Sequence, residues 1–479
     1  MNHREYMSLN ISRRDLMRVG AVTLSGCVPA LYPRNLKAST DEKVQPRGSA
    51  DCVVFVNLVG GPSQMDTFDL KESKTTPADL DVRTAPNGVR WPYGLLPKTA
   101  GVLNDTVLVR SMAAWDTLHN FGQFYQQVGH AYSAARGSEM PSMGAIIAHE
   151  FESRTKPSDF LPAFVAMNFP TSSVNGPLIK EGALDSGAAP LTVDLKSGAA
   201  LPFLLPAGTE SRFDRRMEAL ESFDTVRQLH PANVPKRFLE WEAFTKSAQR
   251  MMKSPDISKV FTLDAAQRDR YGKTPMGDAC LIARNIIAAG AGTRYILINQ
   301  GGWDHHAGIY GKDDQPKGED PKMRGGLYQL CGELDSAFAA LVADLKTLPS
   351  KDGTGSLLDR TFIVCTGEFG RTPGALNDAK GRDHWPAVRS ALFAGGGVKH
   401  PGRVIGATDE AAGKITRLDW ARKRPIYPED VTATIYSVLG IDWTKKISGM
   451  PSGRDFQYVE PMSSTGFIGS TEIMDLFTA

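Results

Sequence analysis

The sequence lacks the features that mark membrane-spanning and nucleic-acid-binding proteins. No run of residues approaches the roughly 20 consecutive apolar positions that a membrane helix needs. The 55 basic residues nearly balance the 53 acidic ones, so net charge indicates neither a nucleic-acid partner nor an acidic disordered chain. We therefore expect a globular protein with no nucleic-acid partner and no transmembrane helix after processing.

Cysteine is scarce, with five residues in the chain, and none forms a C-x-x-C pair. Cys52, Cys280, Cys331 and Cys365 lie in apolar patterns at long, irregular spacings. This favours buried thiols. Disulfides in an oxidising compartment remain an alternative that the sequence does not resolve.

Several catalytic motifs are also missing. No Gly-x-Ser-x-Gly elbow, P-loop or Gly-x-Gly-x-x-Gly follows a predicted strand. His149-Glu150 lacks the second histidine of a His-Glu-x-x-His zinc motif. These absences exclude the common signatures of serine hydrolases, P-loop enzymes, dinucleotide-binding proteins and zinc peptidases.

The amino terminus carries a recognisable export pattern. Arg13 and Arg14 precede a short uncharged run at residues 19–27, which resembles a signal for the Tat export machinery. This predicts a bacterial protein exported in the folded state, to the periplasm or the cell envelope; an ordinary basic tail is the alternative. The segment 24–27 also resembles a lipoprotein cleavage box, in which Cys27 would carry the lipid anchor.

Apolar runs alternate with helical periodicity along most of the chain. The runs, which predict strands apolar on both faces, lie at 52–59, 107–109, 161–167, 295–298, 362–365 and 391–394. Helical patterns occur at 276–289, 327–345 and 428–440. Strands of this kind alternating with helices predict an α/β fold with a doubly wound, mostly parallel sheet flanked by helices.

We expect three regions: a signal and linker at 1–48, the α/β domain at 49–460, and a carboxyl-terminal tail at 461–479. The charge-rich stretch near 205–260 predicts a helical insert that covers the sheet edge.

Acidic residues, histidines and arginines follow four of the predicted strands. With the neighbouring Thr117, the four groups are Asp66 and Asp69; Thr117 and His119; Asp304, His305 and His306; and Glu368, Arg371, Arg382, Asp383 and His384. In open α/β sheets, ligands collect at these carboxyl ends. Carboxylate and imidazole together suit zinc, manganese or iron, whereas an all-oxygen site suits calcium or magnesium. Each acid alone could cap a turn or a helix, but four such sites together favour a metal centre.

The order of motifs resembles the bacterial family called domain of unknown function 1501, which is related in fold to alkaline phosphatases and sulfatases. The resemblance runs from the twin arginine to about residue 440. It rests on segments 60–69, 140–144, 270–272, 302–306, 368–372, 381–384, 395–397 and 406–409. An alkaline-phosphatase-like fold is therefore expected.

The resemblance also implies roles for particular residues. In the wider superfamily an aspartate after the first strand and a later Asp-His pair hold one metal, which implies Asp66, Asp383 and His384 here. A second metal would use Asp304 and His306, with His305 standing where the family has threonine.

Two superfamily features have weaker counterparts. The region of the superfamily's nucleophile holds Thr117, a candidate nucleophile, and His119, which occupies the nearer position and is a candidate metal ligand or general acid. The final metal histidine has no clear counterpart, and His400 is a weak candidate for it. The formylglycine motif of sulfatases, Cys-x-Pro-x-Arg, is absent.

These observations predict an exported, metal-dependent hydrolase acting on a phosphate or sulfate ester of a small molecule or a polysaccharide. One or two divalent ions are expected: zinc, manganese, iron or calcium. Arg371 or Arg382 would clamp the anionic group, because a guanidinium matches phosphate and sulfate oxygens. Glu368 and His305 would orient the metal ligands. The alternative is a non-catalytic envelope protein that keeps the fold and binds a carbohydrate or a protein partner.

Overall fold

The computed structural model describes residues 44–169, 180–195, 208–223, 236–311, 325–460 and 469–478. The predicted signal residues Arg13, Arg14 and Cys27 lie outside these ranges. Everything below refers to the described residues.

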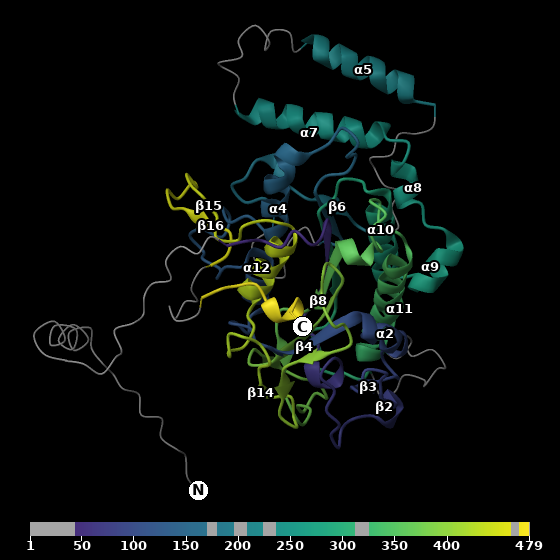
Figure 1. The fold of residues 1–479 in the computed structure, drawn as a ribbon, viewed down its shortest axis with the longest axis vertical. Helices are drawn as coiled ribbons and strands as arrows, with labels where there is room; N and C mark the ends of the chain where they lie inside the picture. Colours follow the sequence, from purple (N-terminus) through teal and green to yellow (C-terminus); the bar gives the residue numbers. More distant parts are fainter. Residues whose placement is uncertain are drawn as a thin grey trace, which may run out of the picture. The chain divides into compact units, whose positions relative to one another are not determined.

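An eight-stranded sheet forms the centre of the fold (Figure 1). In spatial order its strands are β12 (Val404–Ile405), β4 (Thr106–Met112), β11 (Arg389–Ala394), β8 (Thr361–Thr366), β1 (Cys52–Val59), β7 (Tyr295–Gly301), β5 (Phe164–Met167) and β6 (Leu191–Val193). Only β11 runs antiparallel to its neighbours, β4 and β8. The predicted mostly parallel sheet is confirmed.

Strand β1 shows why this sheet forms. Its first seven residues are buried, since it lies between β7 and β8 and both of its faces are covered. Val56 is opposite Ile298 of β7 on one side and Cys365 of β8 on the other. Such a register aligns the carboxyl ends of β1, β7 and β8 at one edge of the sheet. The same edge receives the carboxyl end of β4, because two antiparallel pairings separate β4 from β8.

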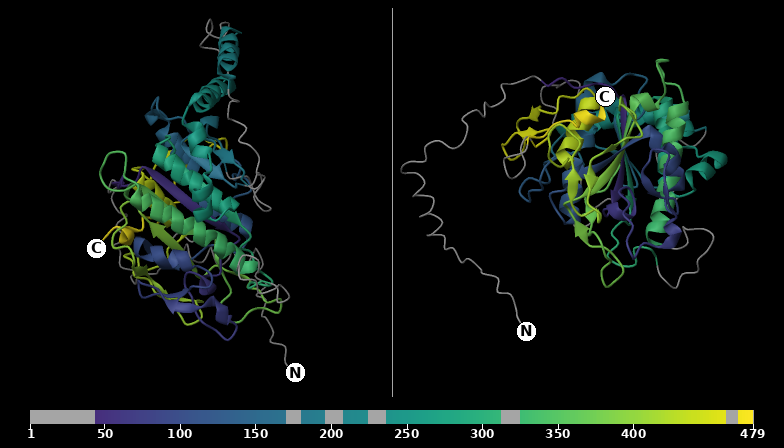
Figure 2. Two further views of the ribbon diagram at one scale, coloured as in Figure 1. Left: turned by 90° about the vertical axis from the view of Figure 1, so that its right-hand side faces the viewer. Right: turned by 60° about the horizontal axis from the view of Figure 1, so that its bottom comes forward.

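Helices cover both faces of the sheet (Figures 1 and 2). One face carries α2 (Pro97–Val102), α9 (Ala265–Tyr271), α10 (Pro275–Ala289) and α11 (Gly326–Thr347), and the other carries α3 (His119–Val128), α4 (Met143–Phe151) and α12 (Pro428–Val438). Apolar side chains of α10 and α11 join the strands in one core. The doubly wound arrangement predicted from the alternating pattern is confirmed.

The stretch near 205–260 is helical in its described part, as predicted. It contains α5 (Glu210–Phe223), α7 (Lys236–Lys253) and α8 (Ile257–Phe261). Residues within 247–251, near the end of α7, line one cavity together with residues of α4 and β6. The insert therefore reaches the edge of the sheet formed by β6.

Short paired strands complete the fold. They are β2 (Val82–Thr84) with β3 (Arg90–Pro92), β9 (Gly370–Arg371) with β10 (His384–Trp385), β13 (Ala407–Thr408) with β14 (Ile415–Arg417), and β15 (Lys446–Ile447) with β16 (Phe456–Gln457). The four cysteines of the described chain are buried free thiols, as predicted. Within the described ranges, no helix combines the length and the hydropathy needed to cross a bilayer.

Candidate metal centre

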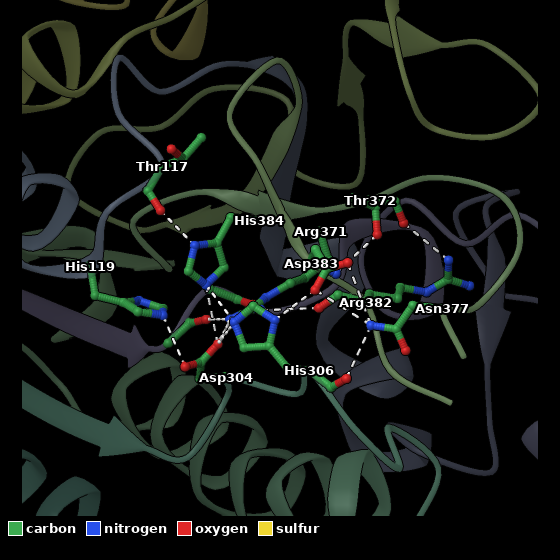
Figure 3. Close-up of polar contacts among 12 residues, drawn as sticks. Thr117, His119, Asp304, His306, Arg371, Thr372, Asn377, Arg382, Asp383 and His384 are labelled. Atoms are coloured by element: carbon green, nitrogen blue, oxygen red, sulfur yellow. Dashed lines mark hydrogen bonds and ion pairs between the residues drawn. The ribbon is translucent and has the colours of Figure 1, made fainter. Parts of the chain in front are cut away.

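Four side chains meet at the carboxyl edge of the sheet (Figure 3). They are His119, Asp304, His306 and His384, and one ligand atom from each lies within 4.8 Å of the others. His119 follows β4, Asp304 and His306 follow β7, and His384 lies in β10 beyond β8. We call these four residues the histidine–aspartate cluster. It contains His119, His306 and His384, whereas His400, the other candidate for a metal ligand, and His305, predicted to orient ligands, lie outside it.

His119 is the first residue of α3, which places its ring at the start of the helix. Nδ1 lies 2.7 Å from Oε1 of Glu368. Glu368 is fully buried and also accepts the Gly60 N–H at 2.9 Å. Nε2 is buried and lies 3.0 Å from Oδ2 of Asp304, without the alignment of a hydrogen bond. This nitrogen is therefore a buried polar atom that the protein leaves unsatisfied.

The charges around His119 favour a cation at this position. Burial alone would lower the pKa of His119, but the hydrogen bond and the charge of Glu368, together with the charge of Asp304, outweigh it and raise the pKa.

His306 is oriented by its neighbour across the site. Its Nδ1 lies 2.7 Å from Oδ1 of Asp383, and its Nε2 lies 2.9 Å from Nε2 of His384. Asn377 donates to the His306 carbonyl oxygen at 3.1 Å and faces the Asp383 carboxylate. Asp383 thus contacts the edge of the His306 ring that points away from the cluster.

His384 is positioned by pairing and by a backbone carbonyl. In the two-stranded sheet it lies opposite Arg371. Its Nδ1 lies 2.5 Å from the Thr117 carbonyl oxygen, while its Nε2 lies 3.2 Å from Oδ1 of Asp304. Burial, followed by the charge of Arg371, lowers the pKa of His384.

One pattern is common to the three histidines. Each Nδ1 faces an oxygen that can only accept, on Glu368, Asp383 or the Thr117 backbone. In the neutral ring Nδ1 must then carry the proton, so Nε2 carries a lone pair. The three Nε2 atoms converge on each other and on Asp304. Lone pairs repel at such distances unless a cation lies between them, and acceptors behind the rings are typical of metal-binding histidines.

Asp304 is held in place by Arg371, whose Nη2 lies 2.6 Å from Oδ1. Partial burial acts to raise the pKa of Asp304. The hydrogen bond and the charge of Arg371 outweigh this effect and hold the pKa well below its ordinary value. Arg371 is fully buried, and its guanidinium group also donates to the backbone oxygens of Gly60, Gly61 and Arg382. Its guanidinium therefore faces the protein interior.

Asp66 lies in a different environment from the one predicted. Arg382 forms a buried ion pair with it at 2.7 Å, and Ser63 and Tyr310 donate to it at 2.5 and 2.6 Å. Arg382 is fully buried and also donates to the backbone oxygens of Thr372 and Gly374. The structure thus places Asp66 outside the histidine–aspartate cluster.

The remaining predicted residues lie around the cluster or apart from it. Thr117 is exposed and contributes its carbonyl group to His384. His305 is outside the cluster, and its backbone carbonyl accepts from Arg382; burial, and then the charge of Arg371, lowers its pKa to about 4. His400 is also outside the cluster.

Close backbone packing explains the glycines beside the site. Gly60 has φ +115°, and a Cβ there would lie 2.5 Å from the Asp304 backbone nitrogen. The loops after β1 and β7 can approach each other only because this side chain is missing.

Sequence reasoning missed three supporting residues: Asn377, Tyr310 and Ser63. Each is a polar residue in a loop or a turn, where no periodicity reveals its partner. Ser63 contacts Asp66 three residues later, whereas the contacts of Tyr310 and Asn377 depend on segments that are distant in the sequence.

The chain belongs to the family described as "Protein of unknown function (DUF1501)", which matches residues 50–465. The family predicted from the motifs is thus confirmed. No curated protein matches the chain significantly.

Solved structures with similar folds come from the alkaline phosphatase superfamily and from sulfatases. The phosphonate monoester hydrolase of Silicibacter pomeroyi is 13% identical with a TM-score of 0.40, over 90% of this chain and 76% of that one. An alkaline phosphatase superfamily protein of Vibrio parahaemolyticus is 11% identical with a TM-score of 0.37, over 83% and 69%. A putative sulfatase of Bacteroides thetaiotaomicron is 10% identical with a TM-score of 0.36, over 82% and 71%. Because the TM-scores and identities are low, these structures indicate no role for any residue of this chain.

Proposed function

We propose that this chain is an exported, metal-dependent hydrolase that acts on a phosphate or sulfate ester. The observation that carries the proposal is the convergence of three Nε2 atoms and one carboxylate, with an acceptor behind each ring. His119, Asp304, His306 and His384 would hold a single ion. This differs from the sequence expectation, in which Asp66 and Asp383 were ligands.

The donor set indicates which metals fit. Three imidazole nitrogens and one carboxylate oxygen suit zinc, manganese or iron, whereas calcium prefers oxygen donors alone. The carboxylates of Glu368 and Asp383 would raise the basicity of the histidines that they contact.

A divalent ion in the cluster would supply Lewis acidity toward the ester group. The protein residues would then orient and admit the substrate. Asp304 and His306 have side chains 42% and 46% exposed, so a substrate reaches the cluster from solvent. Arg371 would fix Asp304, and Arg382 would fix the loop that carries Asp383. Because both guanidinium groups are buried, we propose that they orient the site and do not clamp the anion.

Thr117 is the remaining candidate for an attacking side-chain oxygen. Its backbone is fixed against His384, and the residue is exposed beside the cluster. Water is the alternative nucleophile. A Thr117→Ala variant that retains turnover would leave water as the attacking group.

A second function has specific support. Asp66 and Asp304 are both paired with buried arginines, an arrangement that a non-catalytic envelope protein binding a carbohydrate or a protein would also tolerate. In that case the cluster would keep a structural ion or none.

One experiment separates these functions. The mature protein, purified without chelator, is analysed for metals by inductively coupled plasma mass spectrometry, beside Asp304→Ala, His384→Ala and the control Asp378→Asn. Aryl phosphates and aryl sulfates are then tested for hydrolysis. About one equivalent of a transition metal, lost in the first two variants and kept in the third, together with ester turnover, supports the hydrolase. Bound metal without turnover favours the binding protein. A folded wild type that takes up no zinc, manganese or iron contradicts the metal site.

Export is a separate part of the proposal. Arg13 and Arg14 would direct the folded chain to the Tat machinery, and Cys27 would anchor it if lipidated. Replacing both arginines with lysine should retain the protein in the cytoplasm in a fractionation assay. Labelling with a fatty-acid analogue, compared between the wild type and Cys27→Ala, tests the anchor.

A further inference from the structure

A cavity of about 360 Å³ lies at the edge of the sheet opposite to the histidine–aspartate cluster. It is bounded by the end of α4, the loops before β5 and β7, the strand β6, and the face of α7 at residues 247–251. Since the lining residues 161–163 precede β5, and Gly292 and Arg294 precede β7, the cavity lies at the amino ends of the strands. None of the four cluster residues lines it. Its volume is in the range of small-molecule sites.

The walls of the cavity are mainly apolar. Its apolar residues come from α4, the loop before β5, β6 and α7; they include Phe151, Leu161, Leu191, Ala248 and Met251. Such a surface favours an apolar or aromatic ligand body, because contact with it removes apolar area from water.

Three arginines line the same cavity: Arg154, Arg250 and Arg294. The guanidinium groups of Arg154 and Arg294 each lie 5.0 Å from the centre of the Phe151 ring. One aromatic side chain thus supports two of the three cations beside the cavity.

In the part of the chain that the structure describes, the three cavity arginines lack carboxylate partners. Arg268 and Arg360 form ion pairs with carboxylates, whereas in the described ranges none of the three cavity arginines does so. Among the described residues, Arg294 donates to the backbone oxygen of Asp51, at 3.2 Å. Three guanidinium groups without a carboxylate partner leave charge-assisted donors available to a ligand.

The two carboxylates of the lining are fewer than its three arginines, so the lining keeps a net positive charge. Asp159 accepts the backbone N–H of Lys156 at 2.9 Å, and Glu152 is the other acid. The lining therefore carries three positive and two negative side chains.

We propose that this cavity binds a small organic anion with an apolar body, such as an aryl or short acyl carboxylate, sulfonate or sulfate. The apolar part lies against Phe151, Leu191 and Met251, and the anionic group faces Arg250 and Arg294. The site is separate from the metal centre, so this binding does not depend on the proposed hydrolase activity.

Two matched probes test the proposal on the mature, metal-loaded protein. The first is 8-anilinonaphthalene-1-sulfonate, and the second is N-phenyl-1-naphthylamine, which has the same rings without the sulfonate. Fluorescence titration of the folded protein should give one molecule of the anion per chain. Arg250→Gln and Arg294→Gln should each weaken its binding about tenfold or more, the loss expected for one charge-assisted hydrogen bond. The uncharged probe should bind more weakly and equally in all arginine variants.

Two further variants complete the design. Ala248→Trp fills the cavity and should abolish binding of both probes. Arg90→Gln removes an exposed arginine that pairs with Glu72 elsewhere and should leave binding unchanged. Unchanged affinity for the anion in both cavity-arginine variants, equal affinity for the uncharged probe, or saturation at several molecules per chain would overturn the proposal. The arginine variants decide the outcome even if Ala248→Trp fails to fold, and metal content provides an independent check that the other site is intact.

Discussion

Asp383 lies behind the ring of His306, with Oδ1 2.7 Å from Nδ1. The contact fixes which nitrogen of His306 faces the cluster. It also gives Asp383 a role that its position in the sequence does not reveal, since the neighbouring His384 enters the cluster itself while Asp383 orients another ligand.

The first prediction follows from this contact. Asp383→Ala should weaken metal binding about 10–100-fold, as expected when an outer partner of a ligand is lost. Asp304→Ala should reduce it much further, because a ligand is lost. Affinities from competition with a chromophoric chelator measure both effects, and Asp378→Ala, an exposed acid in the same loop, is the control. Equal losses in Asp383→Ala and Asp304→Ala would instead indicate that Asp383 is itself a ligand.

The second prediction concerns Asp66, which the structure pairs with Arg382 in the interior. Asp66→Asn should leave the metal stoichiometry unchanged. It should lower the free energy of unfolding by about 3–5 kcal/mol, because a buried guanidinium loses its counter-charge. Denaturant titration and metal analysis of the same sample provide both values.

A matched control for Asp66 is the exposed pair of Asp81 with Arg83. Asp81→Asn should change stability little, since exposed ion pairs contribute little. Loss of metal from Asp66→Asn, with stability retained, would return Asp66 to the role of a ligand.

The third prediction concerns the approach of two loops. Gly60→Ala should reduce both stability and metal content, because its Cβ would lie against the backbone of Asp304 and displace it. Gly88→Ala is the control: its φ is also positive, at +82°, but no atom lies within 4 Å of a Cβ there. That variant should cost only about 1–2 kcal/mol of backbone strain and keep the metal. Similar metal loss in both variants would show that strain, and not crowding, is responsible.

The fourth prediction concerns acid stability. His130 is buried and lies 2.7 Å, through Nε2, from the Gln457 carbonyl oxygen. Burial lowers its pKa from 6.5 to about 4, with the charge of Arg136 acting in the same direction. The unfolded chain therefore takes up a proton before the folded chain does. Stability should be complete above pH 6.5 and fall between pH 6.5 and pH 4, by up to about 3 kcal/mol from this group.

His130→Gln removes the titrating group and keeps a donor toward the Gln457 carbonyl. The difference in free energy of unfolding between the wild type and this variant, measured at pH 7 and at pH 4.5, isolates the contribution. The variant should lose less stability than the wild type on acidification. An equal loss in both proteins would contradict the assignment to His130.

Local pattern was enough to predict the elements of the fold. The runs at 52–59 and 362–365 predicted strands that the structure places at the centre of the sheet. The helical periodicity at 327–345 predicted α11 to within two residues at the carboxyl end. These predictions succeed because a strand buried on both faces leaves a continuous apolar run in the sequence. A helix buried on one face instead leaves apolar residues three and four positions apart. The acidic residues and histidines that follow four of the predicted strands added the expectation of a site at the carboxyl edge.

The sequence by itself therefore determined the type of sheet, its helical layers, and the set of side chains at one edge. Tertiary structure alone decided which members of that set enter the cluster and which of them support it. Asp66 and Asp383 have the same chemistry in the sequence, yet one pairs with Arg382 and the other orients His306, while His119 enters the cluster through Glu368. The ion pair of Asp66 with Arg382 joins residues 316 positions apart, and no local pattern records which partner a polar side chain meets. Their partners depend on loop paths that packing fixes only when the sheet is assembled.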